Sequence, residues 1–266
     1  MSSPTSSTEA ACQTAIEVAA KSLSLPTVRT QAGELAEAAT RDGLTHRGYL
    51  AELLAAEVDH RAIRRRERRL KEARFPRMKT LSGFDFDAAP AIPAATVATL
   101  AAGDWIDAGQ PVVLLGDSGT GKTHLLIALG VAACEQGRSV RYLTTAQLVN
   151  ELVEAADERQ LSRIVARYGR LDLLLLDELG YLQLDTRGAE LLFQVLTDRE
   201  ERASVAVASN APFSEWGSTF TDPRLAAAVV DRLTFNAHII QTGSDSYRLR
   251  SARAKTTTKG TTTTHT

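Results

Sequence analysis

Five short apolar runs lie between residues 111 and 241, and segments with helical spacing separate them. The runs are PVVLL (111–115), VRYL (140–143), LDLLLL (171–176), ASVAVAS (203–209) and AHIIQ (237–241). A run that is apolar at nearly every position predicts a strand buried on both faces, and strands that alternate with helices predict a parallel sheet. We therefore expect an α/β fold in which helices flank a parallel sheet.

The first part of the chain has apolar positions three and four residues apart instead. One helix is predicted from Pro26 to near Gly43. A second begins after Thr45, a suitable N-cap, and ends at Phe75, because the following proline disfavours helix in the residue before it. The apolar faces consist of Val28, Ala32, Leu35, Ala36 and Ala39 in the first helix and of Leu50, Leu53, Leu54 and Val58 in the second.

These patterns divide the chain into four segments. Residues 1–25 begin with a Ser- and Thr-rich stretch, and we expect them to be disordered. Residues 26–80 are expected to form a small, basic, helical N-terminal domain, and residues 81–250 the α/β domain. Residues 251–266 are a polar, low-complexity tail that we also expect to be disordered.

The composition is that of an ordinary globular protein. Of 266 residues, 44% are hydrophobic and 24% are charged, which is enough apolar material for a core. Cys12 and Cys134 lie far apart and match no metal-binding spacing, which favours a reducing compartment. No apolar run approaches the roughly 18 residues that a membrane span needs. We expect a cytoplasmic protein without a membrane partner.

The formal net charge of −1 conceals a basic segment at residues 61–79, RAIRRRERRLKEARFPRMK. A charge run can be simply a solvated helix face. A run this long and rich in arginine repels itself, however, unless an anionic partner relieves the repulsion. The phosphates of duplex DNA are the simplest such partner. The predicted DNA contacts are Arg61, Arg64, Arg65, Arg66, Arg68, Arg69, Lys71 and Arg74.

The segment GDSGTGKT, residues 116–123, follows one predicted strand and precedes a predicted helix. Its glycines allow backbone N–H groups to face phosphate oxygens, and the helix N-terminus adds positive charge. Lys122 reaches the β- and γ-phosphates of a nucleotide, and the Thr123 hydroxyl is a ligand for Mg²⁺. The predicted nucleotide-binding residues are Gly116, Asp117, Ser118, Gly119, Thr120, Gly121, Lys122, Thr123 and His124.

Two further predicted strands end in polar residues that complete a catalytic site. Asp177 ends the LDLLLL strand, at the edge where open α/β sheets bind ligands, and is predicted to hold Mg²⁺. Glu178 is predicted to act as the general base that activates water, which indicates ATP hydrolysis. Asn210 follows the ASVAVAS strand and is predicted to sense the γ-phosphate, although an asparagine there is also a common turn residue.

The helix predicted at residues 222–233 carries Arg224 and Arg232. A hydrolytic site built on Lys122, Asp177 and Glu178 still needs an arginine to neutralise transition-state charge, and a neighbouring subunit often supplies it. Either arginine could instead form a surface salt bridge. The sequence alone leaves the choice between them open.

Taken together, these motifs resemble the AAA+ P-loop NTPases, and specifically the IstB-type transposition helpers, which are related to the DnaC helicase loaders. The resemblance rests on ARFPRMKTLSGFDF, LLGDSGTGKTHLLIALG, LLLLDELGYL, SNAPFSEWG and GDSYRLR. It identifies residues 116–123 with the Walker A motif and Asp177-Glu178 with Walker B. It also implies that Arg232 reaches the nucleotide of a neighbouring subunit. By the same comparison, the segment from Phe84 to Phe86 lies close to the adenine.

The resemblance implies a function for the whole chain. Such proteins bind ATP, oligomerise on duplex DNA through their ATP sites and present that DNA to a partner transposase, with hydrolysis as the switch. A DnaC-like loader of a replicative helicase is the alternative, because the same catalytic motifs serve both. A small-molecule kinase fits poorly, since no basic lid follows Asp177 and Glu178 would direct ATP to water.

Overall fold

The computed structural model describes residues 4–181, 183–244 and 246–247, so the predicted tail at residues 251–266 lies outside the described part. The chain forms two compact units, residues 1–68 and 69–266, and each is described separately. Within the described residues, no helix is long and apolar enough to cross a membrane.

The first unit is helical. It contains α1 (Pro4–Ser22), α2 (Pro26–Arg41) and most of α3 (His46–Ala73). Ala20, Val28, Ala32 and Leu53 form its small buried core, and Ile16 packs against them. The expectation of disorder over residues 1–25 is therefore wrong for residues 4–22. Ile16 and Ala20 stand four residues apart on one helix face, a spacing that the Ser- and Thr-rich start of the chain obscures.

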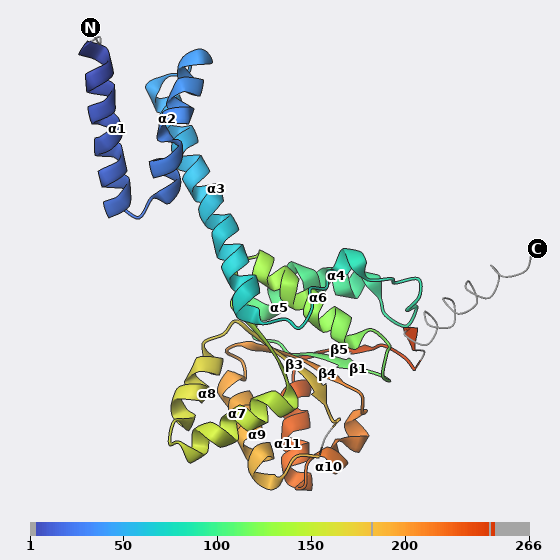
Figure 1. Ribbon diagram of the computed structural model, residues 1–266. Coiled ribbons are helices and arrows are strands. Elements are labelled where there is room, and N and C mark those ends of the chain that lie inside the picture. The colour runs from blue at the N-terminus through green and yellow to red at the C-terminus, as the bar shows by residue number, and fades with distance from the viewer. Residues whose placement is uncertain (1–3, 182, 245, 248–266) are drawn as a thin grey trace, which may run out of the picture. The chain divides into compact units, whose positions relative to one another are not determined.

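The second unit is the predicted α/β domain (Figure 1). It has one parallel five-stranded sheet in the order β2-β3-β4-β1-β5. All five predicted strands are confirmed, with ends that differ by a few residues. The strands are β1 (Val112–Leu115), β2 (Val140–Thr144), β3 (Leu173–Leu179), β4 (Ser204–Ser209) and β5 (His238–Gln241).

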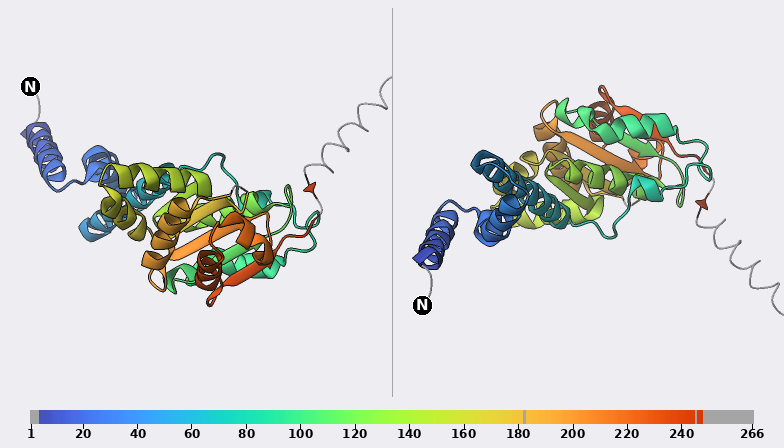
Figure 2. Two further views of the ribbon diagram at one scale, coloured as in Figure 1. Left: turned by 90° about the horizontal axis from the view of Figure 1, so that it is seen from below. Right: turned by 90° about the horizontal axis from the view of Figure 1, so that it is seen from above.

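Helices cover both faces of this sheet, as Figures 1 and 2 show. One side has α4 (Ala94–Ala102), α5 (Asp104–Asp107) and α6 (Lys122–Glu135). The other side has α7 (Thr145–Asp157), α8 (Leu161–Gly169), α9 (Thr186–Arg199), α10 (Trp216–Thr219) and α11 (Pro223–Thr234). Short 3-10 turns lie at Leu81–Gly83 and Phe213–Glu215.

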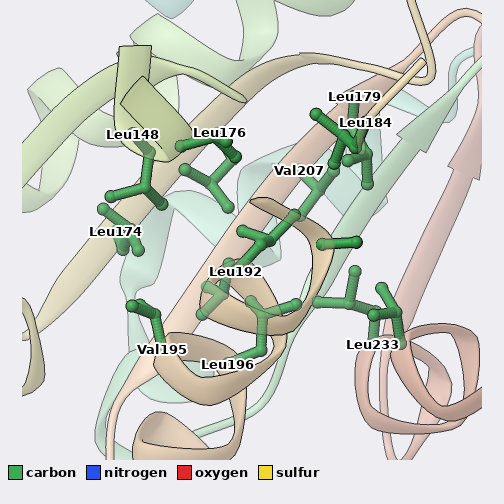
Figure 3. Packing of buried hydrophobic residues seen from close by; sticks show 14 of the residues in the cluster. Leu148, Leu174, Leu176, Leu179, Leu184, Leu192, Val195, Leu196, Val207 and Leu233 are labelled. Carbon is green, nitrogen blue, oxygen red and sulfur yellow. The ribbon is translucent and has the colours of Figure 1, made fainter. Parts of the chain in front are cut away.

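Each face of the sheet has its own apolar core. In the core shown in Figure 3, Leu174 and Leu176 of β3 and Val207 of β4 meet Leu192 and other side chains of α9. The opposite core lies between the sheet and α6. The alternation of leucines along β3 toward the two cores explains why this strand is apolar at every position from 173 to 176.

The boundary between the units falls between Arg68 and Arg69, earlier than the predicted boundary at residue 80. Leu70 in the last turn of α3 and the following Phe75, Leu81 and Phe84 all pack against the core on the α6 side. The end of the arginine-rich helix is thus part of the α/β unit, because its apolar side chains are buried there.

Candidate functional site

The phosphate-binding loop joins β1 to α6, as predicted. Gly121 is the N-cap of α6 with φ 100°, and a Cβ there would lie 2.8 Å from the Phe84 ring. A Cβ on Gly116, which has φ 147°, would lie 2.4 Å from the Thr242 hydroxyl. Both positions require glycine, because side chains would collide and these backbone angles disfavour any other residue.

Lys122 is the first residue of α6 and is buried. Its ammonium donates hydrogen bonds to the carbonyl oxygens of Gly116 and Asp117, both at 2.6 Å. The side chain therefore folds back over the loop and places its positive charge beside the N-terminus of α6. Charge and helix dipole act together there on an anionic group such as a phosphate.

The other loop residues divide into buried and accessible groups. Thr120 is buried, and its hydroxyl bonds to the Asp117 carbonyl at 2.8 Å and to the Thr242 hydroxyl at 2.6 Å. It shapes the loop from within. Asp117 and Ser118 are exposed, and Gly119 and Thr123 are half-buried.

His124 faces the segment that enters the domain. Its Nε2 lies 3.0 Å from the Thr80 carbonyl oxygen, and its ring meets Phe84 edge-on with centroids 5.1 Å apart. Phe84 also contacts Phe86, at 4.8 Å. An aromatic pair thus lies beside the phosphate-binding loop, where a nucleotide base can stack.

The chain after β5 also contacts this loop, a feature that our sequence analysis missed. Asp117 N donates to the Gly243 carbonyl at 3.1 Å, and Tyr247 N donates to the Gly119 carbonyl at 3.0 Å. Thr242 bonds to the loop through Thr120 as well. The available signal was topological, because β5 and β1 are parallel neighbours and both chains leave the sheet at the same edge.

Asp177 lies on β3, buried at the same edge as the loop. Both of its carboxylate oxygens have a donor: Oδ1 accepts from Glu178 N at 2.9 Å and Oδ2 accepts from the Tyr142 hydroxyl at 2.8 Å. The strands β3 and β1 both border β4. With strands about 4.8 Å apart, Asp177 is roughly 10 Å from the end of β1.

The residues at this edge suit a magnesium–nucleotide complex. The Thr123 hydroxyl and the Asp177 carboxylate are hard oxygen ligands, which Mg²⁺ prefers, and Mg²⁺ commonly takes its remaining ligands from water and substrate phosphates. Burial, together with the adjacent Asp177 charge, raises the pKa of Tyr142, so its hydroxyl stays protonated and donates to the carboxylate.

Glu178 has an unusual backbone conformation, φ 60°, at an irregularity in the pairing of β3 with β4. A non-glycine residue in this region costs about 1–3 kcal/mol and is often found at functional sites. Its exposed side chain lines a cavity of about 470 Å³ between α7 and the segment after β3. Water therefore has access to a carboxylate adjacent to Asp177.

Asn210 directly follows β4 and is half-buried. Since β4 lies between β3 and β1, Asn210 emerges between Asp177 and the phosphate-binding loop. The structure thus brings together Lys122, Asp177, Glu178 and Asn210 at one edge of the sheet.

The two candidate arginines lie elsewhere. Arg224 is exposed at the start of α11. Arg232 lies near the end of α11 and lines a second cavity, together with residues that precede β1, β4 and β5. Arg232 pairs with Glu200 at 3.1 Å, donates to the Thr197 hydroxyl at 3.1 Å and covers the Phe193 ring. It therefore lies at the amino-terminal edge of the sheet, opposite the phosphate-binding loop.

The eight predicted DNA-contacting residues all lie on α3 or directly after it, and they differ in their surroundings. Arg61 and Arg64 pair with the buried Glu57 at 2.9 and 3.3 Å, and Arg69 pairs with Glu72 and donates to the Gly137 carbonyl. Arg65, Arg66, Arg68, Lys71 and Arg74 are exposed, as are Arg61 and Arg64.

Comparison with known proteins supports the nucleotide-binding interpretation. Residues 18–255 match the family model described as IstB-like ATP binding protein. The chain is 41% identical over 231 residues, 86% of its length, to an insertion sequence ATP-binding protein of Sinorhizobium fredii, of which the match covers 78%. It is 38% identical over 248 residues to the IS21 ATP-binding protein of Pseudomonas aeruginosa, with 93% of this chain and 94% of that one covered.

Solved structures show the fold at lower identity. AMPPCP-bound DnaA from Aquifex aeolicus matches with a TM-score of 0.55 at 22% identity, over 69% of this chain and 56% of the DnaA chain. DnaI matches with a TM-score of 0.51 at 20% identity, over 63% of this chain and 89% of that one. The expected AAA+ P-loop fold is confirmed. With its family model matched over most of its length, this chain belongs to the IstB-like ATP-binding protein family.

Proposed function

We propose that this protein is an ATP-hydrolysing helper of transposition that oligomerises on duplex DNA and presents it to a partner transposase. The observation that carries the proposal is the convergence of Lys122, Asp177 and Glu178 at one sheet edge in a member of an insertion-sequence ATP-binding family. The arginine-rich helix α3 supports the DNA-binding part of the proposal, because its exposed arginines suit a phosphate backbone.

Each residue of the site has a distinct role in hydrolysis. The loop amides and Lys122 bind the β- and γ-phosphates, and Thr123 with Asp177 holds Mg²⁺, which neutralises phosphate charge when bound. Glu178 orients the attacking water and accepts its proton. Asn210, between the two motifs, hydrogen-bonds the γ-phosphate or the water and so distinguishes ATP from ADP.

We assign Arg232 to the nucleotide of a neighbouring subunit. The six residues of β4 span about 20 Å at 3.3 Å per residue, so Arg232 cannot reach the loop of its own chain. A second subunit that docks this edge onto the nucleotide edge of the first would complete the site. Arg224 lies near the start of α11 and therefore does not lie at the amino-terminal edge with Arg232.

Light scattering of the protein with plain duplex DNA tests the proposal. Wild type should form large assemblies with ATP but not with ADP, and Glu178→Gln with ATP should form assemblies that persist. Lys122→Ala, which removes the phosphate-binding ammonium, serves as the control and should form none.

The alternative function gives a different result in the same experiment. A helicase loader would not assemble on plain duplex DNA, but would bind once a replicative helicase is added. That outcome would reject the transposition-helper proposal. Equal assembly on DNA with ATP and with ADP would reject the nucleotide switch itself.

A further inference from the structure

A buried tyrosine on the neighbouring strand contacts the proposed metal-binding carboxylate. Tyr142 lies on β2, 8% exposed, and its hydroxyl donates to Asp177 Oδ2 at 2.8 Å. The strands β2 and β3 pair in register, with Tyr142 opposite Leu175. The tyrosine therefore reaches forward along the sheet, toward the edge at which the nucleotide-binding loop lies.

The Tyr142 hydroxyl and Glu178 N together restrict the Asp177 carboxylate. One donor bonds to each oxygen, so rotation of the carboxylate about its last torsion angle would break at least one hydrogen bond. Each oxygen keeps a lone pair for another ligand. A donor to a metal-binding carboxylate fixes the orientation of that carboxylate and tunes its affinity for the metal.

The tyrosine ring is held by its surroundings. Phe75, just beyond α3, packs against it with ring centroids 6.4 Å apart and an interplanar angle of 58°. Phe75 fits there because Gly130 of α6 lacks a side chain, and a Cβ at that position would lie 3.0 Å from the Phe75 ring. Tyr142 thus has a defined position from which its hydroxyl can act.

We propose that Tyr142 is a positioning residue that orients Asp177 for the magnesium ion of the bound nucleotide. The inference rests on the proposed function, since it presumes that the site binds a magnesium–nucleotide complex. Tyr142 acts through Asp177 and does not itself contact the nucleotide. Its removal should therefore weaken the response to Mg²⁺ and leave metal-free nucleotide binding intact.

The test is the affinity of the full-length protein for a fluorescent ADP analogue, measured in EDTA and then at rising Mg²⁺ concentration. Tyr142→Phe removes only the hydroxyl and keeps the ring in the core. Tyr168→Phe is the matched control, because Tyr168 is also buried and its hydroxyl donates to another carboxylate, that of Glu151.

We expect Tyr142→Phe to bind the analogue in EDTA as wild type does, but to need about tenfold more Mg²⁺ for the same gain in affinity. Tyr168→Phe should follow wild type throughout. In an Asp177→Asn background, Tyr142→Phe should add no further shift, because the two residues act as one unit.

Three results would overturn the inference. The first is a Mg²⁺ response of Tyr142→Phe that equals that of wild type, and the second is a shift that persists in the Asp177→Asn background. The third is loss of nucleotide binding in EDTA by Tyr142→Phe but not by Tyr168→Phe, which would make Tyr142 purely structural. If wild type itself gained no affinity from Mg²⁺, the proposed function would fail as well.

Discussion

Glu57 joins α2 and α3 in the N-terminal unit, and its removal should loosen their contact. It lies on α3, 3% exposed. One carboxylate oxygen accepts from Thr27 N at 2.8 Å and Val28 N at 3.1 Å, in the first turn of α2. The other oxygen pairs with Arg61 and Arg64. A single side chain thus caps α2 and neutralises part of the arginine run.

The expected cost follows from what the change leaves behind. Glu57→Ala leaves two buried N–H donors without an acceptor, and each such donor costs about 1–3 kcal/mol. A total of about 3 kcal/mol corresponds to roughly a hundredfold increase in local opening of α2. Glu57→Gln keeps one acceptor oxygen and should cost about 1.4 kcal/mol, which corresponds to a tenfold increase in local opening of α2.

Hydrogen exchange measures this opening directly. Peptides from α2 should exchange faster in Glu57→Ala than in Glu57→Gln, and faster in both than in wild type. Peptides from α7, in the other unit, provide the internal control and should not change. Equal protection of α2 in all three proteins would refute the capping role.

The same contact predicts a dependence on pH. Burial opposes the charge of Glu57, but hydrogen bonds from Arg61 and from the Val28 and Thr27 amides outweigh it, so its pKa lies below the ordinary 4.5. A lowered folded-state pKa gives stability that is complete above the unfolded value and lost as pH falls through the folded value. Below pH 4.5, wild-type α2 should therefore approach the behaviour of Glu57→Gln.

Three further predictions concern the nucleotide and DNA sites. Replacing the exposed Arg65 and Arg66 by alanine should lower the slope of log duplex affinity against log salt concentration by the equivalent of about two phosphate contacts, without lowering the Tm. An unchanged slope in anisotropy titrations would place the DNA elsewhere. Gly121→Ala should weaken ATP binding at least about tenfold, since its Cβ would lie 2.8 Å from an aromatic ring; unchanged calorimetric affinity would contradict the geometry. Lys122→Ala and Arg232→Ala should each lose ATPase activity, whereas an equal mixture should recover about a quarter of it if the two variants occupy positions at random, because one interface in about four then joins an intact Lys122 to an intact Arg232; no recovery would reject action between subunits.

The sheet and the edge that carries the candidate site were predictable because the information is local. Each buried strand is a continuous apolar run, and the polar residue that ends it, such as Asp177 or Asn210, must emerge at the carboxyl edge. The loop glycines and Lys122 occur together in one short segment. The placement of all these residues at one edge needs only the parallel topology that the pattern already indicates.

Contacts between distant segments were not predictable in the same way. Tyr142 looks like an ordinary strand residue, and only the pairing of β2 with β3 brings it to Asp177. Similarly, Arg61 and Arg64 suggest a uniform basic face, whereas Glu57 pairs with both. The early helix was missed because Ala20 and Ile16 are covered only through contact with residues of α2 and α3.

The positions of Lys122 and Arg232 restrict how subunits can assemble. The nucleotide loop lies at the carboxyl edge of the sheet, and Arg232 lies at the amino edge. If one subunit's Arg232 serves the next subunit's nucleotide, the interface joins two different surfaces and is therefore heterologous. Such contacts repeat in one direction and generate a ring or a helical filament, in which each nucleotide site receives the arginine of the adjacent subunit. Repeated subunits would also present α3 many times along one DNA, so that modest phosphate contacts in each subunit combine into strong, ATP-controlled binding.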